Sequence, residues 1–296
     1  MTSVDFAAVF AEAEVDGFFH AVDLATGNEL GHQPDGYVIP ASVFKVPVLL
    51  ELFRQHEAGE IDVTNVVDIP VTPRTSGPFG LSNMLDPVSM SLRDLAWLMM
   101  GISDNAATDF ICDRVGLDKV NVTLASLDLT NTVVSGHCED LFAEARDDLG
   151  VLTLEELTRP TWEMFEKVAA FDPQRATTRT TPRDMTRLLA AIWRDDGDGA
   201  VQAAYPEVRR ILGLQVWPHR LASGFADLDE VTTSGKTGTL PTIRNEVGVV
   251  AYPDGGRYAV ACFTRAHRLT QKHAAADAVI GTSARLAVDA LRAMAA

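Results

Sequence analysis

The segment ASVFKVPVLLELFRQHE, residues 41–57, decides the fold, because its apolar side chains surround nearly the whole circumference of a helix. A helix that is apolar on almost every side is buried, so we expect residues 42–57 at the centre of the molecule. Pro47 falls near the first turn, where a missing N–H costs least. Ser42 and Lys45 lie one turn apart on the same face, so the amine can reach the hydroxyl.

This pairing suggests a nucleophile and its base. A serine hydroxyl is a weak nucleophile until a neighbouring base accepts its proton, and burial lowers the pKa of a lysine enough to make it such a base. The alternative is structural, with Ser42 capping the helix and Lys45 extending its amine to solvent. The apolar neighbours favour the catalytic interpretation, because a charged lysine in an apolar environment is costly unless it is paired.

The rest of the chain places helices between two sets of strands. Capping and turn residues, together with apolar periodicity, predict the element boundaries. We expect helices at 4–14, 92–100, 106–115, 182–193 and 271–295, a hairpin over 17–31, and strands at 233–239, 245–252 and 257–264.

Strands near both ends with helices between them predict an α/β (α+β) fold, in which both termini complete one sheet flanked by helices. We expect residues 1–38 plus 214–296 to form a discontinuous α/β lobe and residues 39–213 to form an inserted all-helical lobe. The active site is expected between the two lobes.

Composition limits the possible partners. The 296-residue chain has 47% hydrophobic residues and a formal net charge of −16, which opposes binding to nucleic acid or to an anionic membrane surface. We therefore expect a small-molecule ligand, while the oligomeric state stays open. Cys112, Cys138 and Cys262 lack metal-site spacing, so we expect free thiols, no metal and no cofactor.

The chain starts without the basic and apolar stretches of a leader peptide, and no run reaches the length of a membrane span. As written it is expected to be cytoplasmic; it is expected to be periplasmic or secreted if a leader has been removed from the natural chain.

Two further motifs carry possible chemistry. Ser103-Asp104-Asn105 lies in a turn between two predicted helices, and on its own it is most simply a turn with capping residues. Lys236-Thr237-Gly238 lies on a predicted strand, where the glycine permits close approach of a ligand to the backbone. The argument rests on the conjunction of SxxK, SDN and KTG in this order.

With these three motifs the sequence resembles the class A β-lactamases and penicillin-binding proteins, which are penicillin-recognising serine hydrolases. The resemblance covers nearly the whole chain and implies a β-lactamase/transpeptidase-like fold. It implies that Ser42 attacks a carbonyl to form an acyl-enzyme, that Lys45 accepts or relays the proton, and that Ser103 passes a proton to the leaving group. Lys236 would hold Ser103 and favour an anionic substrate.

The resemblance also implies the binding residues. Asn105 would hydrogen-bond a substrate amide, and the backbone N–H groups of Ser42 and Thr239, beside Gly238, would form the oxyanion hole. Thr237 would bind the substrate carboxylate together with a cation. That cation maps to Arg244 or Asn245 depending on a one-residue gap, and an arginine fork suits a carboxylate better.

One element of the family is missing. Class A β-lactamases carry a Glu-x-x-x-Asn loop whose glutamate orients the water for deacylation, and this chain has no such motif. Counting forward from SDN reaches Glu139, whereas counting backward from Pro182 reaches Glu166, and a surface carboxylate is an alternative interpretation of each. His137 is a further candidate base.

Three functions are compatible with a chain that has the three motifs and lacks the Glu-x-x-x-Asn motif. The first is a β-lactamase that opens β-lactam amides and confers antibiotic resistance. The second is an esterase, amidase or acyltransferase of the same fold with little β-lactamase activity. The third is a penicillin-binding sensor that is acylated without turnover, because an acyl-enzyme without a positioned base hydrolyses slowly.

Overall fold

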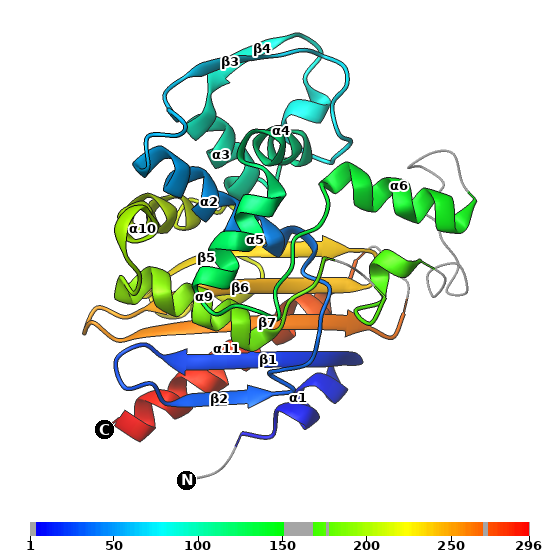
Figure 1. Ribbon diagram of the computed structural model, residues 1–296. Helices are drawn as coiled ribbons and strands as arrows, with labels where there is room; N and C mark the ends of the chain where they lie inside the picture. Colours follow the sequence, from blue (N-terminus) through cyan, green and yellow to red (C-terminus); the bar gives the residue numbers. More distant parts are fainter. Residues whose placement is uncertain (1–3, 151–167, 176–177, 269–271, 296) are drawn as a thin grey trace.

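The computed structural model describes residues 4–150, 168–175, 178–268 and 272–295, and these form a central antiparallel sheet with helices on both faces (Figure 1). The sheet order is β2-β1-β7-β6-β5. Its strands are β1 (Val15–Asp23), β2 (Glu29–His32), β5 (Thr232–Leu240), β6 (Ile243–Ala251) and β7 (Arg257–Ala266). The N-terminal hairpin therefore pairs with the C-terminal strands through β1 and β7, which confirms the predicted fold class.

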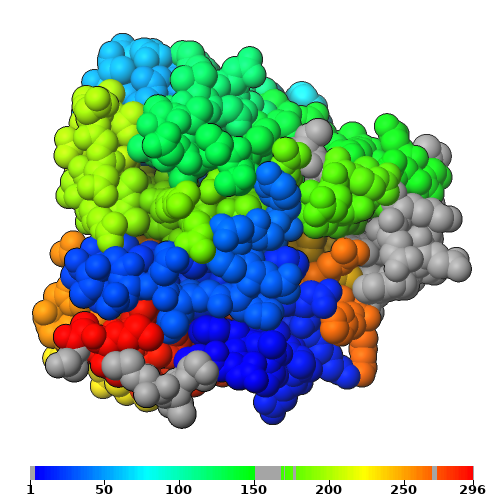
Figure 2. Space-filling view, turned by 60° about the horizontal axis from the view of Figure 1, so that its bottom comes forward, coloured from blue at the N-terminus to red at the C-terminus, as the bar shows by residue number. Residues whose placement is uncertain are grey.

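One face of the sheet is covered by the two ends of the chain. Helix α1 (Phe6–Glu12) and the long helix α11 (Ala274–Ala295) pack there around a cluster that includes Phe10, Phe19 and Ile280. Figure 2 shows the blue N-terminal residues next to the red C-terminal helix on the same surface. Both termini thus stabilise the sheet from one side.

The other face of the sheet carries the remaining helices of the described residues. They are α2 (Lys45–Glu57), α3 (Leu92–Gly101), α4 (Asn105–Val115), α5 (Leu117–Ser126), α6 (Cys138–Leu149), α9 (Pro182–Arg194) and α10 (Gly199–Leu212). Short 3-10 turns are η1 (Ala41–Phe44), η2 (Gly80–Asn83), η3 (Ala169–Phe171) and η4 (Leu221–Phe225). A separate two-stranded sheet, β3 (Val66–Ile69) with β4 (Val88–Ser91), was not predicted from the sequence.

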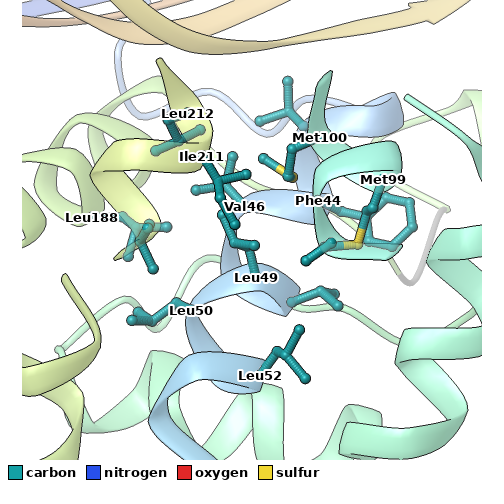
Figure 3. Close-up of a cluster of buried hydrophobic side chains, with 14 of the residues drawn as sticks. Phe44, Val46, Leu49, Leu50, Leu52, Met99, Met100, Leu188, Ile211 and Leu212 are labelled. Atoms are coloured by element: carbon teal, nitrogen blue, oxygen red, sulfur yellow. The ribbon is translucent and has the colours of Figure 1, made fainter. Parts of the chain in front are cut away.

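Helix α2 forms the centre of this half, as its all-round apolar pattern predicts. Figure 3 shows its side chains in contact with apolar residues of α3, α9 and α10. Val46, Leu49, Leu50 and Leu52 are completely buried. Burying each such side chain contributes about 1.5–3 kcal/mol, so α2 is a rigid base for the residues at its start.

The ends of several helices follow the chemistry of their capping residues. Ser91 accepts a hydrogen bond from the N–H of Asp94 at the start of α3, and Thr181 does the same for Asp184 at the start of α9. Gly116 ends α4 with a φ of 79°, a conformation that favours glycine.

The division into two lobes stays a prediction. Helix α9, which was expected within the helical lobe, packs against strands β1 and β7 of the sheet. No helix in the part of the chain that the structure describes is long and apolar enough to cross a membrane.

Candidate active site

Ser42 lies where two cavities meet. One, of about 190 Å³, is bounded by Ser42 and by the first half of α6, from Cys138 to Glu144; we call it the α6 cavity. The other, of about 600 Å³, extends from Ser42 past Ser103 and Thr237 to the start of α11; we call it the α11 cavity. Residues from all three sequence motifs therefore reach the walls of one cleft.

Ser42 is held in a short 3-10 turn directly before α2. The turn η1 covers Ala41–Phe44, and the N–H of Lys45 bonds back to the carbonyls of Ser42 and Val43. Side chains three residues apart nearly eclipse one another in a 3-10 turn, so Ser42 and Lys45 point to the same side. Ala41 has a φ of 47°, which is strained for alanine and marks the sharp entry into the turn.

Lys45 is completely buried and turns its amine toward the SDN turn. Its Nζ donates to the carbonyl oxygen of Ser103 at 2.8 Å and to Oδ1 of Asn105 at 3.0 Å, and it lies 3.4 Å from Oγ of Ser103. These acceptors are uncharged. Burial lowers the pKa of Lys45 from its usual value, although the nearby carboxylates of Asp104 and Asp109 oppose the shift.

The SDN turn is fixed by Asp104, whose side chain is buried. Its carboxylate accepts from the N–H of Ala107, as the N-cap of α4, and from the N–H of Leu81 at 2.7 Å. Ser103 itself has a φ of 63°, a left-handed conformation that is costly for a serine. The surrounding contacts impose this conformation, and it presents the Ser103 hydroxyl to both lysines.

Lys236 approaches the same hydroxyl from the sheet. Its Nζ donates to Oγ of Ser103 at 2.9 Å and to the carbonyl of Thr237 at 2.9 Å. Burial, followed by the neighbouring Lys45, holds the pKa of Lys236 well below its usual value. Two lysine amines therefore converge on one hydroxyl, an arrangement suited to supplying and replacing a proton.

Gly238 is needed for the contact between β5 and the nucleophile turn. A Cβ at this position would lie 2.5 Å from the carbonyl oxygen of Pro40 and 3.2 Å from Cβ of Ala41. The sequence suggested that this glycine admits a ligand, whereas the structure shows the protein's own backbone in that space. The close approach brings β5 and its neighbour Thr239 to Ser42.

The outer edge of β5 has one N–H covered and the next available. Thr237 donates its N–H to Oε1 of Gln215 at 2.7 Å. Because alternate residues of a strand direct their N–H groups to the same edge, the N–H of Thr239 points to the open edge beside Ser42. Thr239 lines both cavities.

The two candidates for the anion-binding cation occupy different environments. Asn245 is fully buried and donates to the carbonyls of Ile39 and Pro40, so it supports the nucleophile turn and does not line either cavity. Arg244 lines the α11 cavity, donates to the carbonyls of Leu240 and Ile243, and lies 3.7 Å from Asp277. Of the two, Arg244 has the position for contact with a ligand.

Arg220 is a further cation that the sequence analysis missed. It is 3% exposed and donates to the carbonyls of Gly238 and Asn245, to Oγ1 of Thr239 at 2.8 Å and to Asp277 at 2.7 Å. It follows α10 in a loop without a motif, so no signal in the sequence pointed to it.

The loop that carries Arg220 is fastened to the sheet by Glu246. Gln215 donates to one oxygen of this buried carboxylate at 2.7 Å, and the N–H of Leu221 donates to the other at 2.7 Å. Burial raises the pKa of Glu246 from its usual value. Both ends of the segment 215–221 are thus bonded to a single side chain.

Of the two carboxylates predicted as deacylation bases, the structure describes Glu139. Glu139 pairs with Arg146 at 2.6 Å and lines neither cavity, whereas Glu166 lies outside the described residues. His137 lines the α6 cavity and bonds to Asp140 through Nδ1 at 2.9 Å.

Cys138 occupies the wall of the α6 cavity near Lys45. The thiol is buried, and burial raises the pKa of Cys138 to about 12. Lys45 lies near enough to oppose this shift, and a Cys138 thiolate would raise the pKa of Lys45. Asp109 fixes the start of α6 by accepting from the N–H of Cys138 at 2.7 Å and of Glu139 at 3.0 Å. Asp109 lies four residues after Asn105 on α4, a spacing that could have indicated a shared face.

In the ranges that the structure describes, no group of three or more His, Cys, Asp or Glu side chains could hold a metal ion. The three cysteines of the chain are free.

Comparison with known proteins gives consistent relatives. A family model described as the beta-lactamase enzyme family matches residues 2–291. The beta-lactamase regulatory protein BlaB of Streptomyces cacaoi is 30% identical, covering 95% of this chain and 94% of that protein.

Solved structures with the same fold include a beta-lactamase from Sphaerobacter thermophilus, with a TM-score of 0.75 and 25% identity over 96% of this chain and 97% of that one. An acyl-enzyme complex of a PBP-A mutant with penicillin G has a TM-score of 0.74 and 20% identity over 98% of this chain and 94% of that one. At that lower identity the likeness shows the fold.

Proposed function

Because the chain belongs to the beta-lactamase enzyme family, we propose that it is a serine hydrolase that forms an acyl-enzyme on Ser42 and opens the amide of a β-lactam. The observation that carries the proposal is the hydroxyl of Ser103. It lies within 3.4 Å of Lys45 Nζ and 2.9 Å of Lys236 Nζ, in the cavity that Ser42 lines.

Acylation begins with the transfer of the Ser42 proton to Lys45. A neutral amine has two N–H groups, which serve the carbonyl of Ser103 and Oδ1 of Asn105, and its lone pair is left for the Ser42 hydroxyl. The Ser42 oxygen attacks the carbonyl carbon, and the carbon–nitrogen bond breaks. Ser103 gives its proton to the leaving nitrogen and regains one through the neighbouring lysines.

Charge that develops on the carbonyl oxygen meets backbone donors. The N–H of Ser42 lies at the start of the 3-10 turn and the N–H of Thr239 on the open edge of β5, and two such donors form an oxyanion hole. A carboxylate next to the leaving nitrogen would be bound by the hydroxyls of Thr237 and Thr239 and by the cation Arg220, which holds Thr239 at 2.8 Å.

Turnover of a chromogenic cephalosporin tests the proposal. We expect hydrolysis by the wild-type protein and none above background by Ser42→Ala, whose smaller side chain keeps the surrounding turn. Equal rates for the two proteins would remove the proposal. Hydrolysis of p-nitrophenyl esters faster than of the cephalosporin would instead favour an esterase or amidase of the same fold.

A second candidate function is a penicillin-binding sensor that deacylates slowly. It is favoured because the residue of the α6 wall that lies near Lys45 is Cys138, which is not a carboxylate. A thiol with a pKa raised to about 12 cannot act as a base near neutral pH, and Glu139 is turned toward Arg146. The similarity to a protein named as a regulator of beta-lactamase supports the same function. A penicillin adduct that persists for hours in intact-mass measurements favours the sensor, whereas one that disappears within seconds favours the hydrolase.

A further inference from the structure

The segment between α10 and β5 passes the active site without regular secondary structure. Residues 213–220 lie in neither a helix nor a strand. The N–H groups of Leu214 and Val216 bond to carbonyls in the last turns of α10 and α3, and the side chains of both residues are exposed. Gln215, between them, is turned toward the sheet and bonds to β5. The contacts of Gln215 therefore help to set the position of this segment.

The amide of Gln215 joins the edge of β5 to the buried carboxylate of Glu246. Its Oε1 accepts from the N–H of Thr237 at 2.7 Å, and its Nε2 donates to Oε1 of Glu246 at 2.7 Å. A backbone N–H can only donate and an ionised carboxylate can only accept, so these two neighbours fix which end of the amide faces the strand. A flipped amide would bring two donors together at Thr237 and two acceptors together at Glu246.

The second oxygen of Glu246 holds the other end of the segment. Oε2 accepts from the N–H of Leu221 at 2.7 Å, and Leu221 directly follows Arg220, which donates to Oγ1 of Thr239 at 2.8 Å. Arg220 and Lys236 lie close enough to Glu246 to favour its ionised form against the cost of burial. An ionised carboxylate has an acceptor oxygen for each of the two donors, whereas an amide in its place has one.

Gln215 and Glu246 act at one remove from a bound substrate. Neither residue lines the α11 cavity, whereas Thr237 and Arg220, which they hold, both line it. In the proposed mechanism Thr237 and Arg220 bind the carboxylate next to the leaving nitrogen. An effect of Gln215 or Glu246 on the reaction must therefore pass through these two residues.

Resting on the proposed acyl-enzyme function, we propose that Glu246 and Gln215 are positioning residues for the substrate carboxylate. They hold Thr237 and Arg220 at a spacing at which both can contact one anion. They also keep the N–H of Thr237 occupied, so that the oxyanion meets the N–H of Thr239.

Benzylpenicillin and its methyl ester test the inference, because they differ in this one carboxylate. Both would acylate Ser42 by opening the same amide, so the ratio of their second-order rate constants reports the recognition of the anion. We expect the wild-type protein to prefer the free acid by about tenfold, the contribution of one charge-assisted hydrogen bond. Timed intact-mass measurements give both rates.

Glu246→Gln should reduce this preference to about twofold, because an amide cannot accept from both donors. The substitution removes a negative charge, which by itself would favour the free acid and raise the preference, so a decrease reports lost positioning. A contribution to stability alone would slow both compounds together. Gln215→Met cuts the same contact from the other side and should also lower the preference, so it replaces Glu246→Gln if that variant does not fold.

Exchanging the two side chains should restore the preference. In the double variant Gln215→Glu with Glu246→Gln, the carboxylate at position 215 can accept from the N–H of Thr237 and from the amide at position 246. The oxygen of that amide can accept from the N–H of Leu221. All three hydrogen bonds can thus form again with the total charge unchanged, and we expect the preference to return to within about twofold of the wild-type value.

Gln55→Met is the matched control for a lost contact between a glutamine and a buried glutamate. Nε2 of Gln55 donates to Oε1 of the buried Glu51 at 2.7 Å within α2, and neither residue lines the α6 or the α11 cavity. The control should lower the melting temperature and keep the full preference for the free acid.

The outcomes separate this inference from the proposed function. If neither compound acylates Ser42 of the wild-type protein, the acyl-enzyme function fails. If the wild-type protein does not prefer the free acid, if Glu246→Gln and Gln215→Met keep the preference, or if Gln55→Met loses it to the same extent, the function stands and the positioning role is overturned.

Discussion

The two cavities that meet at Ser42 differ in the charge of their walls. The charged side chains on the α6 cavity are Asp140 and Glu144, with His137 bonded to Asp140, and no lysine or arginine of the described residues lines it. Among its described lining residues, the α11 cavity has three cations and one acid. Under the proposed function, the contrast favours a substrate with its anionic group on the side that leaves and a neutral or cationic acyl part on the other.

The net charge of the whole molecule is negative, like the charged residues of the α6 wall. The chain has a formal net charge of −16, whereas most of the charged residues described on the α11 cavity are cations. Under the proposed function, we expect an anionic group of the substrate to lie beside the cations of the α11 cavity and away from the α6 wall. The charges would then influence the orientation of the substrate as well as its affinity.

The largest effect is expected from the loss of Lys45, the proposed base for Ser42, at which the two cavities meet. Replacing Lys45 by methionine keeps the length of the buried side chain and removes the base, so acylation by penicillin should slow by about 1000-fold. Lys119→Met, on the surface, should leave the rate unchanged. Stopped-flow or timed intact-mass measurements give the rates, and thermal melting shows that the variant is folded; a folded Lys45→Met that acylates at the wild-type rate contradicts the mechanism.

A substitution of Cys138, on the wall of the α6 cavity, should change the rate of deacylation. Cys138→Glu places a carboxylate near Lys45, where it can orient water, so the penicillin adduct should disappear about 100-fold faster. Cys138→Gln has nearly the same shape without the base and serves as the matched control. An adduct with the same lifetime in both variants would show that deacylation does not depend on this position.

The pH dependence reports on the shared amines. Burial lowers the pKa of Lys45, so the amine loses its proton below the usual value of 10.5 and becomes a base there. Acylation should therefore rise by about tenfold per pH unit while Lys45 is protonated and level off below pH 10.5. A rising limb that continues to pH 10.5 would mean an unshifted lysine.

The smallest effects should distinguish the acyl sides of three penicillins. Ampicillin, benzylpenicillin and carbenicillin share a nucleus and carry an ammonium, a hydrogen or a carboxylate on the same side-chain carbon. Facing Asp140 and Glu144, they should acylate Ser42 in that order, with about threefold between neighbours. Glu144→Gln should reduce the spread, and a fastest reaction with carbenicillin would reverse the assignment of the two sides.

The sequence predicted the parts of the molecule whose signals are local. The apolar circumference of residues 42–57 identified the central helix, and the capping residues Ser91 and Thr181 marked the starts of α3 and α9. The three motifs named the residues that converge, since each stands on an element with a clear pattern. The 3-10 turn at Ser42 was beyond prediction, because its geometry depends on the close approach of Gly238 to Pro40.

The missed residues act through contacts that join distant segments. Gln215 and Glu246 meet across 31 residues, and Arg220 reaches Asp277 across 57. No spacing rule connects a loop after α10 to strand β6 or to the start of α11. For the same reason, counting along the chain could not replace the missing deacylation motif, because position in sequence did not fix which side chain of α6 faces Lys45.

The most direct test of the central claim is peptide mapping by mass spectrometry after brief exposure to benzylpenicillin. The convergence of Lys45 and Lys236 on the Ser103 hydroxyl, in the cavity that Ser42 also lines, predicts a penicilloyl adduct on the peptide that contains Ser42, and none on that peptide in Ser42→Ala. An adduct on another residue, or no adduct at all in a folded protein, would contradict it.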